Sequence, residues 1–152
     1  MKRILIILAI LLPAAASAQN LSDVFSGDLV PRAKMVETYL QGSRLEPYHL
    51  TEFHSVKFSA SESIQGKVAT AVMENADAAF EKETVYAAGK LVYAILVFHD
   101  SDSQEKKIPS SRFVCFQMVA SEGSDPMITL VEMKGTARLE DLKSIFGSNE
   151  NN

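Results

Sequence analysis

Cysteine is almost absent from the chain, because Cys115 is the only one in 152 residues. A single cysteine cannot form a disulfide within the chain, so a hydrophobic core must hold the fold together. Cys115 lies in the apolar run Phe113-Val114-Cys115-Phe116, where a thiol is typically a small buried hydrophobic group. We therefore interpret Cys115 as a core residue rather than a nucleophile, with pairing between two chains as a secondary alternative.

The chain also lacks an apolar run of the ~20 residues that a membrane-spanning helix needs. The run Ile4–Leu12 is shorter than this, follows Lys2 and Arg3, and precedes an A-x-A pattern at Ala16 and Ala18. This order is typical of a cleavable signal peptide, and a buried N-terminal helix or an uncleaved anchor is the alternative. We predict cleavage near Ala18 and a mature protein that is periplasmic or secreted.

Positive charge is scarce in the predicted mature chain. Removal of Lys2 and Arg3 with the signal peptide leaves 13 basic and 19 acidic residues, a net charge of −6. Nucleic-acid binding requires cations along a phosphate backbone, so we expect no nucleic acid as a partner. The mature chain has no second apolar run long enough to form a transmembrane segment.

Recognisable clusters of reactive side chains are missing as well. His49, His54 and His99 do not have the usual spacing of zinc ligands. We interpret His54 as a half-buried residue of a strand, since it alternates with apolar residues. No G-x-S-x-G motif or glycine-rich phosphate loop occurs, and Gly66 stands alone within a predicted helix.

Two groups of acidic residues lack the features of a site. Asp100, Asp102 and Glu105 have neither the glycine nor the terminal glutamate of an EF-hand loop, so we predict a solvated connection there. Glu81 and Glu83 lie where a strand is predicted to begin, and a solvated face is the simpler interpretation. The sequence therefore predicts no catalytic, cofactor-binding or metal-binding residues.

The clearest helix is predicted over residues 61–80. Ser59 and Glu62 match the S-x-x-E capping box. Apolar residues then recur at spacings of three and four, at Ile64, Val68, Ala71, Val72, Ala76 and Ala79. A second, short amphipathic helix is predicted through Leu139, Leu142, Ile145 and Phe146, with Thr136 as its cap and Gly147 at its end.

Strands account for most of the remaining chain. Apolar runs that alternate or continue predict strands at 52–58, 83–87, 90–98, 112–120 and 127–134, with turns at Ala88-Gly89 and 122–126. The run Leu91–Phe98 is apolar throughout, so we expect either that both its faces are covered or that it is a central strand. The segment 34–45 fits either a helix or a strand, and its β-branched and aromatic residues favour the strand.

These elements predict one domain. Short connections between strands imply a largely antiparallel sheet of five to six strands. We expect an α+β, two-layer fold in which one long and one short helix cover one face of the sheet. The chain then divides into a signal peptide (1–18), a loosely ordered lead-in (19–33), a single α+β domain (34–147) and a polar tail (148–152).

The four tyrosines, Tyr39, Tyr48, Tyr86 and Tyr93, are candidates for a binding face. Tyr86 and Tyr93 flank the predicted hairpin turn, so we favour packing across the two strands as their role.

Five segments, taken in their order along the chain, form a pattern of packing and turn residues. They are Gly42-x-x-Leu45-x-x-Tyr48-x-Leu50, Phe53-His-Ser55-Val56, Asn75-Ala-Asp77, Gly89-Lys-Leu91-x-Tyr93 and Ile128-x-Leu-Val-x-Met133-x-Gly135-x-Ala137-x-Leu139-x-x-Leu142. Together they resemble an uncharacterised family, a domain of unknown function, of small exported α+β proteins from Gram-negative anaerobic bacteria. The resemblance covers about residues 34–146, implies export and a small α+β fold, and favours a strand at 34–41. It supplies no catalytic residues.

We expect a small, soluble, exported domain that is not an enzyme and has no cofactor. Its partner would be a protein or another component of the cell envelope, or its role there would be structural. One alternative is an exported hydrolase that uses His54 or His99. The other is a small-ligand carrier with a pocket between the long helix and the sheet.

Overall fold

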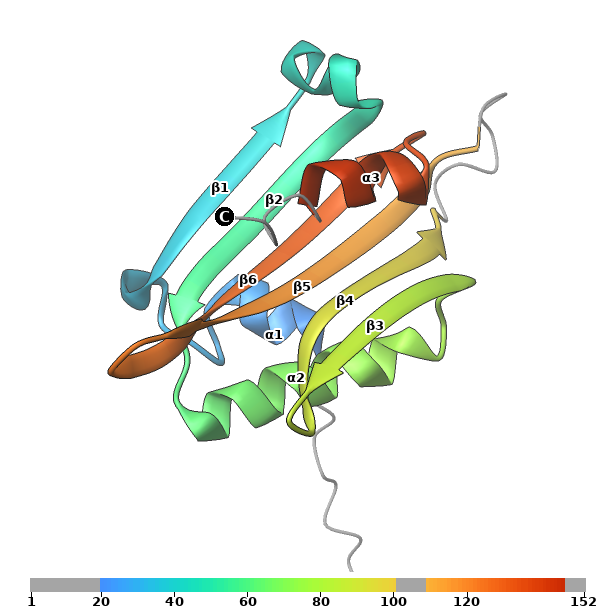
Figure 1. Ribbon diagram of the computed structural model, residues 1–152. Helices are drawn as coiled ribbons and strands as arrows, with labels where there is room; N and C mark the ends of the chain where they lie inside the picture. Colours follow the sequence, from blue (N-terminus) through green and yellow to red (C-terminus); the bar gives the residue numbers. More distant parts are fainter. Residues whose placement is uncertain (1–19, 101–108, 147–152) are drawn as a thin grey trace, which may run out of the picture.

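The computed structural model describes residues 20–100 and 109–146 (Figure 1). Its centre is a six-stranded antiparallel sheet with the strand order β1-β2-β6-β5-β4-β3. The α+β class, the antiparallel sheet and the strand at 34–41 are confirmed. The strands are β1 (Met35–Gln41), β2 (Leu50–Ser59), β3 (Glu81–Ala87), β4 (Lys90–His99), β5 (Ser111–Ser121) and β6 (Ser124–Gly135).

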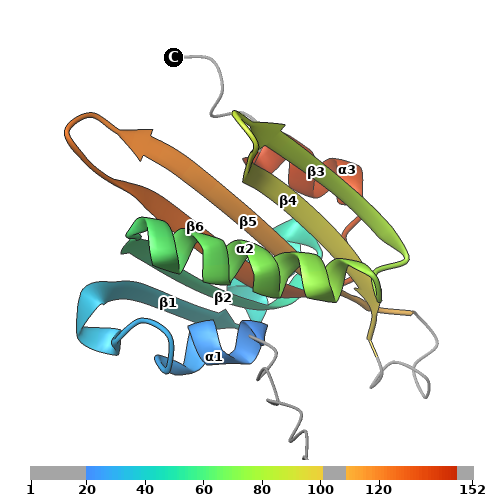
Figure 2. The same cartoon turned by 90° about the horizontal axis from the view of Figure 1, so that it is seen from below.

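Helices lie on both faces of this sheet (Figures 1 and 2). The helices α1 (Leu21–Ser26) and α2 (Glu62–Ala76) cover one face, which we call the α2 face. The helix α3 (Leu139–Phe146) and the 3-10 helix η2 (Ser43–Tyr48) cover part of the other, the α3 face. The prediction that both helices cover one face is therefore wrong. Strands β4 and β5 are apolar on both faces, so each face needs a cover.

Two hydrophobic cores result from this arrangement. The core under the α2 face includes Val56, Phe58, Val68, Val72, Leu96, Val114, Phe116, Ile128 and Leu130. The core under the α3 face includes Leu45, Leu50, Ile95, Val97, Phe113, Cys115, Val131, Met133 and Leu142. The continuous burial from Ala94 to Phe98 confirms that both faces of β4 are covered.

The helix α2 is shorter than the sequence predicts. Its cap is Ser61, whose hydroxyl accepts from the backbone N–H of Ile64, because Ser59 is still paired within β2. The helix ends at Ala76, and the N–H of Phe80 already donates to the carbonyl of Val97 at 3.0 Å. The start of β3 therefore draws the chain into the sheet before a longer helix can form.

The two hairpins depend on turn residues that the sequence indicates. Ala88 and Gly89 have φ values of 50° and 77°, the left-handed conformation that a two-residue hairpin turn requires. This confirms the predicted turn. The turn predicted over 122–126 is confined to Glu122 and Gly123, because β6 already begins at Ser124.

The segment before β1 differs from the loosely ordered lead-in that we predicted. The side chain of Asn20 caps α1, and the Asp23 carboxylate accepts from the backbone N–H of Asn20 at 3.2 Å. Leu21, Val24 and Phe25 are buried against the α2 face. A second short element, the 3-10 helix η1 (Arg32–Lys34), leads into β1.

The start of α3 is fixed by η2. The His49 carbonyl, which follows η2, accepts from the N–H groups of Thr136 and Ala137 at 2.9 and 3.1 Å. The predicted cap at Thr136 is wrong, because α3 begins only at Leu139. The helix begins after Arg138, whose N–H donates to the Asp141 carboxylate at 3.3 Å.

Candidate functional site

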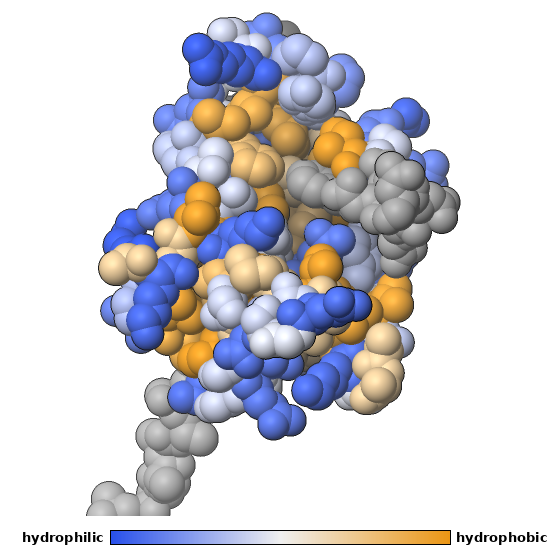
Figure 3. All heavy atoms as spheres, turned by 60° about the vertical axis from the view of Figure 1, so that its left-hand side comes forward, coloured by the Kyte–Doolittle hydropathy of each residue, from blue (hydrophilic) through white to orange (hydrophobic). Residues whose placement is uncertain are grey.

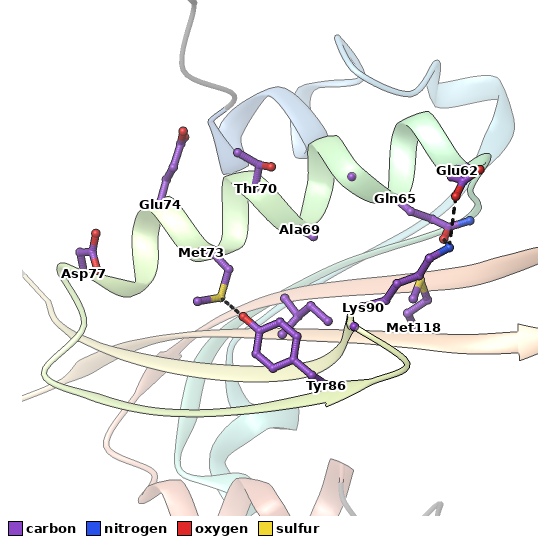
Figure 4. Close-up of a pocket in the computed structure, with 13 residues that line it drawn as sticks. Glu62, Gln65, Ala69, Thr70, Met73, Glu74, Asp77, Tyr86, Lys90 and Met118 are labelled. Atoms are coloured by element: carbon purple, nitrogen blue, oxygen red, sulfur yellow. Dashed lines mark hydrogen bonds and ion pairs between the residues drawn. The ribbon is translucent and has the colours of Figure 1, made fainter.

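A groove of about 630 Å³ runs between α2 and the β3–β4 hairpin (Figure 4). Leu91 of β4 lies buried at its base, and Met118 of β5 and Met73 of α2 are half-buried beside it. The ring of Tyr86, from β3, stands half-exposed opposite Met73. The base and walls of the groove are therefore mostly apolar.

The helix α2 contributes a stripe of residues to this groove at spacings of three and four, which is one face of a helix. This stripe lies beside the core-facing stripe that contains Val68 and Val72. The groove-lining residues of α2 are Glu62, Gln65, Gly66, Ala69, Thr70, Met73, Glu74 and Asp77.

Gly66 leaves the middle of this stripe without a side chain. It lies inside α2, is exposed, and a Cβ placed on it would meet no atom within 4 Å. Glycine in a helix interior costs roughly 0.5–1 kcal/mol relative to alanine. Neither a close contact nor a positive φ requires a glycine here, so its effect in the structure is to widen the groove.

Polar contacts cross the groove at two places (Figure 4). The Tyr86 hydroxyl donates to the Met73 sulfur at 3.4 Å. At one end, the Lys90 ammonium donates to Gln65 Oε1 at 3.4 Å and lies 3.6 Å from a carboxylate oxygen of Glu62. These contacts join the hairpin to the helix while the space between them stays open.

The rim of the groove is acidic. Glu62, Glu74 and Asp77 are exposed along α2, and Lys90 is the only basic residue among those that line the groove. Figure 4 shows Glu74 and Asp77 pointing away from the hairpin, at the outer edge of the helix. The groove therefore combines an apolar interior with a rim whose formal charge is −2.

The three histidines lie in separate environments. His54 Nε2 is 2.7 Å from Glu37 Oε1, and the His54 ring packs on Phe25 with a centroid distance of 4.7 Å. His99 stacks on Phe80 at 4.3 Å. The prediction that His54 is half-buried in a strand is confirmed. Its contacts fasten α1 and β1 to β2, which is a packing role.

A depression of about 440 Å³ brings together His49, Asp141 and Ser144. The hydrogen bonds of Ser144 and Asp141 do not join a nucleophile to a base. The Ser144 hydroxyl donates to the backbone carbonyl of Asp141 at 2.7 Å, and the Asp141 carboxylate accepts from Arg138 Nε at 3.3 Å. The Arg138 side chain, followed by its backbone N–H and by the charges of Arg138 and His49, lowers the pKa of Asp141.

Cys115 is buried, as the sequence predicts. Burial raises the pKa of its thiol to about 12, so the reactive thiolate is scarce at neutral pH.

The predicted packing of Tyr86 against Tyr93 is wrong. Tyr86 lies opposite Leu91 and Tyr93 opposite Val85, with a register shift between the pairs. Tyr93 packs in the core under the α3 face, whereas Tyr86 lines the groove.

Two of the acidic residues considered in the sequence, Asp100 and Glu83, bind neighbouring side chains of the fold. The Asp100 carboxylate accepts from the Ser110 hydroxyl at 2.6 Å, while Asp102 and Glu105 lie outside the described residues. Glu83 forms an ion pair with Lys143 of α3, and this contact raises the pKa of Lys143. Across residues 20–100 and 109–146, no three His, Cys, Asp or Glu side chains are grouped so that they could hold a metal ion.

A family model for DUF6108, a family of unknown function, matches residues 8–146. The chain belongs to this family. The resemblance to an uncharacterised family is thereby confirmed, while the bacterial group and the export that it implied stay predictions. No curated protein and no solved structure shows significant similarity to this DUF6108 domain. In the part that the structure describes, no helix is long and apolar enough to span a membrane.

The sequence of this DUF6108 domain does not by itself indicate which residues line the groove. The sequence does hold one signal for it: Gly66, Ala69 and Met73 form a line of small or apolar residues beside the core-facing stripe of α2. That signal becomes readable only once the position of the β3–β4 hairpin is known.

Proposed function

We propose that this DUF6108 protein is an exported, non-catalytic domain that binds a partner protein through the groove between α2 and the β3–β4 hairpin. Gly66 is the observation that carries the proposal. A glycine that weakens a helix and fills no structural need is explained if the space beside it must receive another molecule.

The lining of the groove suggests the chemistry of that molecule. Leu91, Met73 and Met118 offer an apolar surface, and methionine adapts to ligands of varied shape. The acidic rim favours positive charge at the edges of the ligand. A segment of a partner protein with apolar side chains between lysines or arginines fits both features.

The export of the protein rests on its first 18 residues, which follow the order of a signal peptide. After expression of the full chain in a Gram-negative host, we expect mass spectrometry to find a protein that begins at Gln19 and resides in the periplasm or the medium. Recovery of the intact chain from the cytoplasm would contradict this part of the proposal.

Two peptide probes test the groove itself. Both have the same short apolar centre of leucines and serines, one flanked by lysines and the other by glutamates. Methyl NMR of the methionine-labelled protein is the readout, since Met73 and Met118 line the groove whereas Met133 lies buried in the other core. We expect the lysine-flanked peptide to shift the Met73 and Met118 signals and to leave Met133 unchanged.

Two leucine variants of α2 provide the matched control. Gly66→Leu places a side chain inside the groove, whereas Ser63→Leu places one on an exposed position outside it. We expect Gly66→Leu to abolish the shifts and Ser63→Leu to keep them. The proposal is wrong if both variants respond like the unaltered protein, or if neither peptide shifts Met73 or Met118.

A small-ligand carrier would use the same groove. Native mass spectrometry of protein purified from its own host distinguishes the two functions. A small apolar molecule that remains bound to the unaltered protein and is lost in Gly66→Leu would favour the carrier.

A further inference from the structure

The two edges of the sheet differ in how well they are protected from pairing with another strand. The edge strand β3 begins with the charged run Glu81-Lys82-Glu83, and its register with β4 shifts between Val85 and Tyr86. Charges and bulges on an edge strand discourage further pairing. The strand β3 therefore has the usual features of an edge that stays free.

The other edge strand, β1, lacks these features. It pairs with β2 over all seven of its residues without a register shift, and it contains no proline, lysine or arginine. Glu37 is its only charged residue. Val36 is 68 % exposed and Tyr39 is 55 % exposed. A regular edge strand of this kind is a template for another strand.

The space outside β1 is also open. Figure 1 shows no described helix or strand beyond β1 on its outer side. Figure 3 brings this side of the molecule forward and shows hydrophobic residues exposed among polar ones. A strand could thus approach β1 without displacing any described element.

We propose that β1 pairs antiparallel with β1 of a second copy of the chain, about a two-fold axis through Thr38. The two six-stranded sheets would then join into one continuous sheet. The second copy is favoured as the occupant because the sequence of β1 is complementary to itself.

This complementarity follows from the register centred on Thr38, which pairs all seven residues of both strands. Val36 then lies opposite Leu40 of the second copy, on the α3 face of both sheets. Glu37 lies opposite Tyr39, so the two Glu37 carboxylates are diagonal neighbours and not directly opposite each other. Thr38 lies opposite Thr38, and paired threonines are favourable neighbours across strands.

Neighbouring registers are less complementary. Centring the axis on Glu37 would place two like charges directly opposite each other, which is unfavourable. Centring it on Tyr39 would place Thr38 opposite Leu40 and would leave Met35 and Val36 without partners in β1. The sequence therefore favours one register as well as one partner.

The proposed dimer would carry two of the proposed grooves. The strands β3 and β4 lie at the opposite end of the strand order from β1. Two grooves would thus lie at the two far ends of the joined sheet, free to bind two partner segments at once. Each groove would be complete within one copy, so loss of the dimer should leave peptide binding intact.

Two matched valine variants test the interface by sedimentation velocity of the purified protein. Val36 and Val85 are exposed valines on the two opposite edge strands. Val36→Lys places charge inside the proposed interface, and Val85→Lys places the same charge on β3. We expect the unaltered protein and Val85→Lys to be dimers and Val36→Lys to be a monomer with an unchanged circular dichroism spectrum.

Cysteine crosslinking tests the register. Thr38→Cys would bring two thiols together at the axis, and mild oxidation should link most of the protein into a disulfide-bonded dimer. Val36→Cys should not link to itself, because the two positions would be about 13 Å apart along the strands. The proposal is overturned by a monomeric unaltered protein, by a dimer that persists in Val36→Lys, or by equal crosslinking at both positions.

Discussion

Replacing Gly66 by alanine should stabilise the domain, and this result would separate a functional glycine from a structural one. Gly66 lies within α2 at a helical φ, and an added Cβ would meet no atom within 4 Å. The new methyl group would therefore neither clash nor gain packing contacts. The remaining effect is the lower conformational entropy that alanine has in the unfolded chain.

The magnitude follows from helix propensity. Alanine is more favourable than glycine in a helix interior by about 0.5–1 kcal/mol. For a domain of this size, that gain corresponds to a rise in melting temperature of about 2–4 °C.

Urea unfolding followed by far-ultraviolet circular dichroism is the suitable assay, because the chain has no tryptophan to report on unfolding. The midpoint should rise while the slope m stays constant. Gly89→Ala is the matched control. An added Cβ at Gly89 also meets nothing within 4 Å, but its φ is +77°, so alanine there should lower the free energy of unfolding by about 1 kcal/mol.

A free energy of unfolding that is lower or unchanged in Gly66→Ala would contradict this prediction. The helix would then need glycine at this position for its own structure. The main support for a ligand-binding groove would be lost, whatever happens at Gly89.

Four further predictions concern the sheet and its two cores. Gly135→Ala should lower the free energy of unfolding in urea by about 3 kcal/mol, because the added Cβ would lie 2.6 Å from the Leu50 Cα. A decrease of less than about 1 kcal/mol would contradict this close contact. The Cys115 thiol should resist Ellman's reagent in the folded protein and react in urea, since its pKa is raised to about 12, and rapid reaction without urea would show that Cys115 is accessible. The same raised pKa predicts that the free energy of unfolding falls as the pH rises from about 9 towards 12, because the Cys115 thiol loses its proton first in the unfolded chain. This part of the loss should be absent in Cys115→Ala, and an identical loss in that variant would contradict the raised pKa of Cys115. Leu142→Ala should cost about 3 kcal/mol in unfolding free energy, and a negligible cost would mean that α3 does not pack on the sheet as described.

The periodicity of the sequence predicts most elements but not their placement. Apolar spacing identifies α2 and the strands, because it reports which side chains need to be buried. It does not report which face of the sheet a helix covers. The position of α3 depends on the bonds from Thr136 and Ala137 to the His49 carbonyl, which join residues far apart in the chain.

The missed helix α1 has a different cause. It is only six residues long, which is too short for periodicity to be read. Its capping box at Asn20 and Asp23 is present in the sequence, but it has an aspartate where the usual capping box has glutamate or glutamine. Burial of Phe25 on His54 is the tertiary contact that stabilises this helix.

The candidate site was predicted only in outline. A pocket between the long helix and the sheet was one sequence-based alternative, and the groove lies between α2 and the strands β3 and β4. The sequence does not indicate the lining of this groove, because the positions of Tyr86 and Tyr93 on either side of the turn favour cross-strand packing. The register shift after Val85 places these two tyrosines apart.

Photo-crosslinking in the producing cells tests the groove most directly. Tyr86 and Tyr48 are exposed to 53 % and 51 %, but only Tyr86 lines the groove. Each would be replaced in turn by p-benzoyl-phenylalanine. We predict a discrete crosslinked product from position 86 that disappears in Gly66→Leu, and none from position 48. The same products from both positions, or a product from position 86 that persists in Gly66→Leu, would contradict the proposed binding function.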